Sequence, residues 1–350
     1  MNSKQNNLEE KYKVVLETIK KYPDQLQQAW DEVNAINIPE DYKNIKNIVF
    51  CGMGGSALGA RMVDSLLVDR LKVPFEIFTE YKLPDYVFHE TLVIVSSYSG
   101  NTEETVESAE RALERGAKVF GIATGGKLAQ ILQEKNIPRY IFDPVNNPSK
   151  QPRMSIGYAS GSVLSILTKL GVIKISDDEI ENAINHMREV FEKQKVEQSA
   201  SYKLAEVLSE NAPILVASEH LIGVGHTIKN HFNESAKTFA TLFDLPELNH
   251  HLMEGLENPK SLSKLALFIF VNSSLYSDRV RVRYPLTYEV VKKNGYKYSE
   301  LKPVASSKIG EVYKTLVFGS LVVYYLSKSY KIDPTIIPWV DYFKKKLDSI

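Results

Sequence analysis

Several features that mark particular classes of protein are scarce in this sequence. Cysteine occurs once, at Cys51, so no disulfide can form within the chain. Lysine plus arginine and aspartate plus glutamate both number 43, which gives a formal net charge of +0. No overall basic field would therefore attract nucleic acid or an anionic membrane. The first thirty residues contain no apolar signal-peptide core, which favours a cytoplasmic location.

Long hydrophobic runs and cofactor motifs are also missing. The longest apolar stretch near the C-terminus, TLVFGSLVVYYL, is far shorter than the roughly 20 residues that span a bilayer, so we expect a buried helix and no membrane partner. His, Cys and acidic residues do not cluster at the spacing of metal ligands, and we expect neither a metal nor a cofactor. The glycine-rich GMGGSALG lacks the Gly-Lys-Ser/Thr of a Walker loop and is a poor dinucleotide fingerprint.

The composition is that of an ordinary folded protein with room for two domains. The chain has 350 residues, of which 43% are hydrophobic and 25% charged, and domains of roughly 150 residues are usual. Residues 1–44 predict two helices separated at Pro23, because apolar residues recur at helical spacing on both sides of it. We interpret this segment as a helical lead-in that packs on the lobes.

Short apolar runs then alternate with helical stretches, which predicts α/β lobes with parallel sheets. In residues 45–172 we expect strands at NIVFCG, FEIFT, TLVIVSS and KVFGIA. After helical stretches, the pattern begins again in residues 173–350, with a strand at APILVAS, a helix through HTIKNHFNESAKTFA and a strand at LALFIFVNSS. The sequence therefore predicts two α/β/α sandwich lobes in tandem.

Hydroxyl-bearing side chains are concentrated in VSSYSGNTEET, directly after a predicted strand. Ligands in open parallel sheets bind beyond the carboxyl ends of the strands, where helix N-termini offer free N–H groups. The CGMGGSALG turn follows another strand and belongs to the same edge, where its glycines would let backbone approach an anion. We expect a phosphate group to be bound here by Gly54, Gly55, Ser56, Ser97, Ser99 and Thr102.

A helix start also lies in this stretch. Asn101, with Glu104 three residues later, has the spacing of a capping box, and turn serines can satisfy backbone groups. We expect such a cap alongside phosphate binding, and we assign Ser96 and Tyr98 to packing or turn structure.

An acid and a histidine in the second lobe suit proton transfer. Glu234 lies in the predicted helix, and His250 follows sixteen residues later, beyond Pro246. One such side chain can act as a base and the other as an acid. Spacing alone leaves open a solvent-facing glutamate and a structural histidine.

The motifs together resemble a known group of enzymes. Ser-aromatic-Ser-Gly-x-Thr-x-Glu-Thr after an apolar strand, preceded by Gly-Gly-Ser, resembles the sugar isomerase (SIS) domain family, which binds phosphosugars. NESAK and LPELNH resemble two signatures of the bifunctional phosphoglucose/phosphomannose isomerases, which are tandem SIS-domain enzymes of about this length. The resemblance implies two SIS-type lobes and an aldose–ketose isomerase for glucose 6-phosphate and fructose 6-phosphate, with mannose 6-phosphate as a further expected substrate.

The same resemblance implies roles for individual residues. Ser97, Ser99 and Thr102 match the hydroxyls that hold the sugar phosphate. Glu234 matches the base that moves a proton between C1 and C2. His250 matches a histidine that assists ring opening and is supplied by the neighbouring subunit, so a homodimer is expected.

Two cationic residues complete the expected site. Arg153, in NPSKQPRMSIGY, resembles the arginine beside the enediolate, and a guanidinium suits negative charge on O1 and O2 because it stays protonated. Lys344, in VDYFKKKLDSI, resembles the lysine of the closing helix that reaches the sugar ring. A solvated loop arginine and a solvated basic helix end are the alternatives, and Lys345 is the other register for the lysine.

The sequence departs from the family pattern in places. His251 and Leu252 stand where Asn-Glu usually follows the histidine, and Thr227 replaces an arginine common before the catalytic glutamate. We prefer His250 on register, with His251 as the second choice.

Other SIS proteins remain as alternatives. A phosphosugar-sensing regulator would keep the hydroxyls but would not need Glu234, Arg153 and His250 together, and it would usually carry a DNA-binding lobe. An amidotransferase would need a glutaminase domain with a nucleophilic cysteine, whereas Cys51 lies inside the glycine turn. A ketose 5-phosphate isomerase usually carries a single SIS domain.

Overall fold

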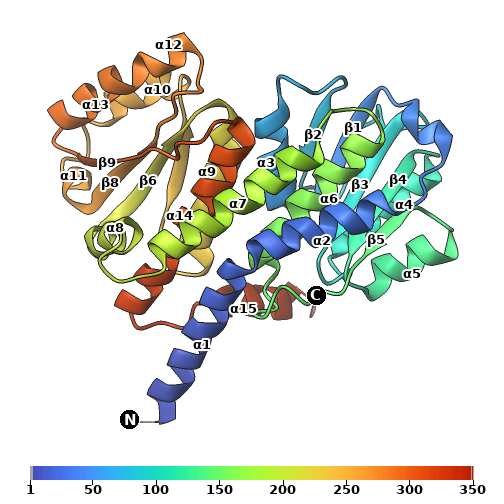
Figure 1. The fold of residues 1–350 in the computed structure, drawn as a ribbon, viewed down its shortest axis with the longest axis horizontal. Coiled ribbons are helices and arrows are strands. Elements are labelled where there is room, and N and C mark those ends of the chain that lie inside the picture. The colour runs from blue at the N-terminus through green and yellow to red at the C-terminus, as the bar shows by residue number, and fades with distance from the viewer. Residues whose placement is uncertain (1–2, 348, 350) are drawn as a thin grey trace.

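Two parallel β-sheets carry the fold, one in each half of the chain (Figure 1). The computed structural model describes residues 3–347 and 349. The strand order is β2-β1-β3-β4-β5 in the first sheet and β7-β6-β8-β9 in the second, so four strands follow the same order in both and the predicted tandem repeat is present. The strands are β1 (Asn47–Gly52), β2 (Phe75–Phe78), β3 (Thr91–Ser97), β4 (Lys118–Ala123), β5 (Arg139–Ile141), β6 (Ala212–Ala217), β7 (Thr241–Asp244), β8 (Ala266–Val271) and β9 (Lys297–Leu301).

Helices surround the sheets and also fill the space between the lobes (Figure 1). The first half of the chain contains α1 (Ser3–Lys20), α2 (Tyr22–Asn34), α3 (Gly55–Leu67), α4 (Glu103–Glu114), α5 (Gly126–Glu134) and α6 (Ile156–Lys169). The second contains α7 (Asp177–Gln194), α8 (Ala200–Leu208), α9 (Ile222–Glu234), α10 (Leu248–Gly255), α11 (Leu262–Leu265), α12 (Asp278–Arg281), α13 (Arg283–Lys293), α14 (Lys308–Ser329) and α15 (Pro338–Leu347).

The central strands are apolar throughout because both of their faces are buried. In β1, Ile48 and Phe50 join the large core that continues into the second lobe, whereas Val49 and Cys51 join a smaller core under α4 and α5. Neighbouring strands of the sheet follow the same alternation. This double burial explains why the sequence predicted β1, β3 and β4 correctly.

The lobes meet through closely packed helices, chiefly α3 of the first lobe against α9 of the second. A side chain cannot be accommodated at Gly223 of α9, since a Cβ there would lie 2.0 Å from the carbonyl oxygen of Arg61 in α3. The close approach packs the start of α9 against α3, the helix that follows the glycine turn.

The apolar C-terminal stretch forms part of α14, as predicted. This helix is long and apolar enough to cross a bilayer, but 89% of its most apolar window is buried inside the protein. It packs against α7, α8 and α9, which places it in the core between the elements of the second lobe.

Three strands and one helix end differ from the sequence prediction. The strands β5, β7 and β9 were not predicted, because all three lie at sheet edges and therefore lack a continuous apolar run. The helix predicted through residue 240 ends instead at Glu234, and the following residues turn into β7. Glu234 is thus a helix-terminal residue, with freedom to face the lobe interface.

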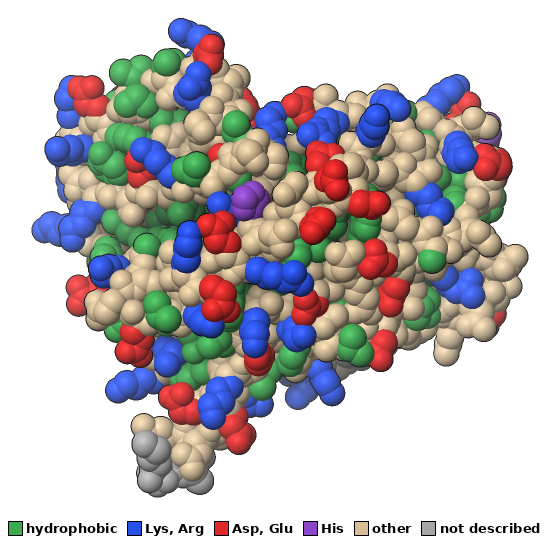
Figure 2. All heavy atoms as spheres, in the orientation of Figure 1, with side chains coloured by type: hydrophobic (Ala, Val, Ile, Leu, Met, Phe, Trp, Pro, Cys, Tyr) green, Lys and Arg blue, Asp and Glu red, His purple; other side chains and the backbone are tan. Residues whose placement is uncertain are grey.

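The N-terminal segment forms the two predicted helices, and Pro23 lies in the first turn of the second one, where its missing N–H is harmless. The helix α1 projects to the free N-terminus in Figure 1, while α2 lies along α6 and α7. Acidic and basic side chains are interspersed over the face shown in Figure 2, in keeping with the formal net charge of +0.

Candidate active site

The hydroxyl-rich turn joins the end of β3 to the start of α4. Ser97 is fully buried, and its hydroxyl donates to Thr102 Oγ1 at 2.9 Å while accepting from the N–H groups of Gly100 and Thr102. Ser97 is therefore occupied with holding the turn. Thr102 keeps its own O–H free to donate, and the exposed Ser99 only accepts a hydrogen bond, from the Asn101 N–H.

The predicted capping box is wrong. The helix α4 begins at Glu103 with Thr102 at its N-cap position, and no side chain caps it. Asn101 instead accepts a hydrogen bond from the Lys127 N–H at 3.0 Å, at the start of α5. The N-terminus of α4 therefore keeps N–H groups available for an anion.

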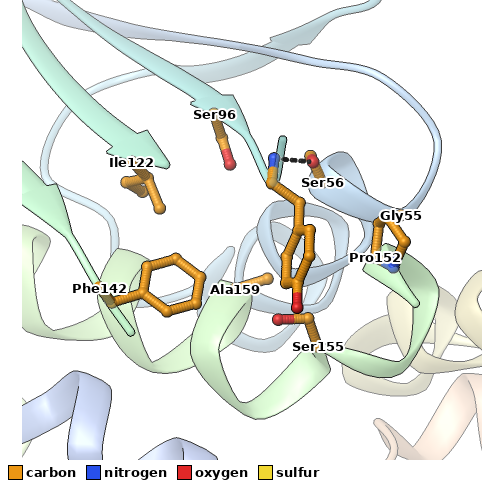
Figure 3. Close-up of a pocket in the computed structure, with 9 residues that line it drawn as sticks. Gly55, Ser56, Ser96, Ile122, Phe142, Pro152, Ser155 and Ala159 are labelled. Carbon is orange, nitrogen blue, oxygen red and sulfur yellow. Dashed lines mark hydrogen bonds between the residues drawn. The ribbon is translucent and has the colours of Figure 1, made fainter. Parts of the chain in front are cut away.

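The glycine turn lies against the loop that carries Arg153. Gly54 has a positive φ of 49°, and a Cβ at Gly55 would lie 2.6 Å from the backbone nitrogen of Arg153. Ser56 Oγ accepts a hydrogen bond from the Tyr98 N–H at 3.0 Å, which Figure 3 marks with a dashed line. The turn thus connects the hydroxyl-rich turn to Arg153 by direct contact.

A small cavity of about 10 Å³ lies beneath these turns. Figure 3 shows Gly55 and Pro152 on one side of it and Ile122 and Phe142 on the other. The hydroxyl of Ser155 is buried here and has no hydrogen-bond partner among the described residues. The volume matches about one water molecule, so the cavity is too small for a ligand of the size of a sugar phosphate.

Arg153 is one of the most deeply buried charged residues, with 2% of its surface exposed. Its guanidinium donates to Ser235 Oγ at 3.0 Å, to Gln151 Oε1 at 3.0 Å, and to the carbonyl oxygens of Pro334 and Thr335 at 2.8 and 3.1 Å. These four bonds use four of the five N–H donors of an arginine, which leaves one on Nη1. Arg153 can therefore offer one N–H to a ligand and cannot bind it in a bidentate way.

Glu234 faces the remaining donor of Arg153. Its Oε2 lies 3.9 Å from Arg153 Nη1, and its side chain is 28% exposed. Burial raises the pKa of the Glu234 carboxyl, while the charges of Arg153, Lys237, Lys229 and Lys344 act in the opposite direction. A partly buried carboxylate with a raised pKa, next to fixed cations, has the properties of a general base near neutral pH.

Residues 333–336, in the C-terminal segment, lie against this pair. Lys237 donates to the carbonyl oxygens of Asp333 and Ile336, both at 2.8 Å, so that it holds the same segment as Arg153 does. Burial lowers the pKa of Lys237 to about 8. On α15, the charge of Lys344 lowers the pKa of Glu234.

His250 does not join this group within one chain. It is exposed on α10, and its imidazole forms no hydrogen bond or ion pair with any described residue. The neighbouring His251 is also exposed and contacts Phe243 at a ring-centroid distance of 6.0 Å. Neither histidine is brought to Glu234 by the fold of a single chain.

Sequence reasoning missed several residues that support the pair. His231, one turn before Glu234 on α9, donates from Nε2 to the Arg153 carbonyl oxygen at 2.8 Å, and burial lowers its pKa to about 4. Gln151 and Ser235 orient the guanidinium. Their adjacency to Arg153 and Glu234 in the two motifs was the available signal, but their contacts depend on the fold.

Comparison with known proteins shows the family of the chain. The SIS domain family matches residues 41–169, and the Bacterial phospho-glucose isomerase C-terminal SIS domain family matches residues 197–347. A Bifunctional phosphoglucose/phosphomannose isomerase from Caldicellulosiruptor bescii is 30% identical over 342 residues, covering 96% of this chain and 99% of that protein. The chain belongs to the bifunctional phosphoglucose/phosphomannose isomerase family. The resemblance noted in the sequence is thereby confirmed.

Other relatives include proteins of the same name and one of a different name. A protein of the same name from Aquifex aeolicus is 28% identical, covering 97% of this chain and 99% of its own. A D-glucosamine-6-phosphate 4-epimerase from Sulfolobus acidocaldarius is 29% identical over 65% of this chain and 70% of that protein. Among solved structures, a hypothetical protein from Thermus thermophilus has a TM-score of 0.75 at 16% identity, covering 98% of this chain and 94% of that one, which supports the two-lobe SIS fold.

Proposed function

We propose that this protein interconverts glucose 6-phosphate, mannose 6-phosphate and fructose 6-phosphate by proton transfer through an enediol intermediate. The observation that carries the proposal is the pairing of Glu234 with Arg153 at 3.9 Å, at the junction of the two lobes. Family membership supplies the substrate class, and the pair supplies groups suited to the reaction.

Glu234 is proposed as the base. In the open-chain aldose, its carboxylate removes the proton from C2 and a proton passes from O2 to O1, and the proton held by Glu234 then returns to C1 to form the ketose. Return to either face of C2 gives the glucose or mannose configuration. The barrier lies in charge development on the two oxygens, so a fixed cation nearby lowers it.

Arg153 is proposed to supply that cation. Its four bonds to protein groups hold it rigidly, and one N–H on the side of Glu234 remains for an oxygen of the intermediate. Lys344 adds a second positive charge from α15. Ser99 and Thr102, with the free N–H groups of α4, are proposed to anchor the phosphate, so that remote binding positions C1 and C2.

His250 is proposed to assist ring opening from the neighbouring subunit of a homodimer. Its exposure on α10 supports this, because it has no task within its own chain. Large apolar side chains also remain exposed, including Phe239 at 77%, Trp339 at 81% and Phe343 at 63%. Such exposed apolar surface favours a protein–protein contact. We propose a cytoplasmic location, in keeping with the single unpaired Cys51.

A coupled assay with glucose 6-phosphate, mannose 6-phosphate and fructose 6-phosphate tests the function. We expect wild-type turnover on all three and a fall in kcat of about 10²–10⁴-fold in Glu234→Gln, which keeps the shape but cannot accept a proton. Glu114→Gln is the matched control, since Glu114 is also the last residue of its helix but is exposed. Full turnover in Glu234→Gln would overturn the assignment of the base.

One relative is named for a different reaction, and the assay should distinguish that reaction from isomerisation. Glucosamine 6-phosphate is added as a fourth substrate because of the 4-epimerase relative. Conversion of this compound without turnover of the other three would replace the isomerase proposal.

A further inference from the structure

The second lobe contains a polar cleft at the position that corresponds to the hydroxyl-rich turn of the first. The shared strand order makes β6, β8 and β9 the counterparts of β1, β3 and β4. Beyond the carboxyl ends of β8 and β9 lies an open cleft of about 300 Å³, a volume at the lower end of small-molecule sites. Its polar lining consists of Asn272, Ser273, Ser274, Arg281, Lys302 and Glu311.

The floor of this cleft carries a buried carboxylate with an unused acceptor. Glu311, in the first turn of α14, is 1% exposed. Its Oε2 accepts from His220 Nε2 at 2.8 Å and from Ser273 Oγ, whereas no described residue donates to Oε1. Oε1 is not fully enclosed by protein, so a donor in the cleft that Glu311 lines can reach it. The free oxygen therefore offers a site for a donor from a ligand, such as a hydroxyl.

The cluster is built for binding rather than for nucleophilic attack. The Ser273 hydroxyl donates to Glu311, and His220 bonds to the same carboxylate, so no imidazole activates the serine. A catalytic triad would need the histidine between the two groups. His220 and Ser273 instead fix the carboxylate in place.

The rim of the cleft is cationic. Arg281 and Lys302 have side chains 47% and 57% exposed, and they pair with Asp278 and Glu300 respectively. Exposed ion pairs contribute little to stability, so both cations can turn toward an anionic ligand. A ligand with hydroxyls at one end and a phosphate at the other would meet Glu311 and the two cations together.

The cleft is separate from the proposed catalytic pair. His220 and Glu311 lie at the N-terminal end of α9, whereas Glu234 is its last residue. A helix of 13 residues is about 20 Å long at 1.5 Å per residue. One substrate molecule cannot span both places.

We propose that this cleft is a second, non-catalytic binding site for a sugar phosphate. Glu311 accepts hydroxyl donors from the sugar, and Arg281 and Lys302 hold the phosphate. The two lobes would then each bind one phosphosugar at the corresponding edge of their sheets, with chemistry at one of them. The part of this statement that concerns the first lobe rests on the proposed function.

Equilibrium dialysis with labelled fructose 6-phosphate tests the proposal, in the Glu234→Gln background so that the probe is not converted. We expect two molecules bound per chain, and one fewer in Arg281→Met/Lys302→Met, because the affinity of the second site falls at least about tenfold. The matched control is Arg279→Met/Lys297→Met, which removes two exposed cations that do not line the cleft and should change nothing.

The decisive outcome is the difference between the two double variants. Loss of one bound molecule in Arg281→Met/Lys302→Met alone supports the site whether or not the wild type isomerises any sugar, so the inference and the proposed function can fail independently. Equal stoichiometry in all three proteins overturns it. Inorganic phosphate should bind the second site at least about tenfold more weakly than fructose 6-phosphate, because it makes no hydroxyl contact with Glu311. Equal binding of the two would overturn the sugar specificity.

Discussion

The charges at the lobe junction explain how a buried acid can serve as a base at neutral pH. Burial raises the pKa of Glu234 above its usual value, because the charged carboxylate loses solvation. Arg153 opposes the shift at 3.9 Å, and Lys344 contributes from another helix. Because the folded pKa is raised, Glu234 stabilises the fold fully only below its unfolded pKa, and this contribution is lost as pH rises through the folded pKa.

The acid limb of the pH–rate profile should report the pKa of Glu234. We expect kcat/KM to fall as pH drops through the pKa of Glu234, at a pH above the ordinary glutamate value of 4.5, because only the carboxylate accepts a proton. Lys344→Met should move the limb to higher pH, since it removes a charge that lowers this pKa.

The matched control is Lys345→Met, one residue further along α15, whose charge is not among the main contributions to the pKa of Glu234. An unchanged limb in Lys344→Met, or an equal shift in both variants, would contradict the choice of Lys344 as the site lysine.

At the scale of elements, the residues of two turns at the edge of the first sheet have different tasks, although the sequence predicted phosphate binding for all of them. Ser97 holds the turn through three hydrogen bonds, so its hydroxyl is committed before any ligand arrives. Ser99 and Thr102 keep free donors. Gly55 allows the glycine turn to touch the backbone of Arg153, so the proposed phosphate site and the guanidinium are in direct structural contact.

Alanine substitutions should separate these tasks. Ser99→Ala and Thr102→Ala are expected to raise KM about tenfold or more each with little change in thermal stability, because each removes a hydrogen bond to a charged phosphate. Ser97→Ala should lower the free energy of unfolding by about 1 kcal/mol, because the Thr102 N–H and Thr102 Oγ1 lose their partner while the Gly100 N–H keeps the Ser97 carbonyl oxygen.

Steady-state kinetics and urea unfolding, made on the same preparations, provide the two readouts. A loss of stability in Ser99→Ala equal to that in Ser97→Ala would show that the turn, rather than the ligand, uses that hydroxyl.

At the scale of the whole molecule, a single chain brings together Glu234, Arg153 and Lys344 but leaves His250 outside. The predicted histidine therefore requires a second chain if it acts at all. The exposed aromatic side chains of α15 lie on the helix that also carries Lys344, which places apolar surface beside the proposed site.

Mixing two inactive variants tests whether His250 acts across subunits. Glu234→Gln and His250→Ala should each be nearly inactive, and after dissociation and reassociation together they should recover about a quarter of wild-type activity, because half of the dimers contain one intact site of two. His251→Ala, mixed with Glu234→Gln in the same way, decides between the two histidines.

Each variant alone, taken through the same dissociation, is the control. Absence of recovery, or a fully active monomer in analytical ultracentrifugation, would exclude a histidine supplied in trans.

The sequence by itself determined the two parallel sheets, because central strands buried on both faces must be apolar throughout, and it determined which turns carry hydroxyls and glycines. Its motifs also singled out Glu234 and Arg153. Only the tertiary structure decided how these groups are used. Arg153 donates to carbonyl groups 181 and 182 residues away. The Ser97 hydroxyl forms hydrogen bonds within its own turn, and one carboxylate oxygen of Glu311 is without a partner among the described residues at a second cleft. Hydrogen-bond partners and burial set donor availability and pKa, and both depend on segments that are distant in sequence and meet only in the folded chain.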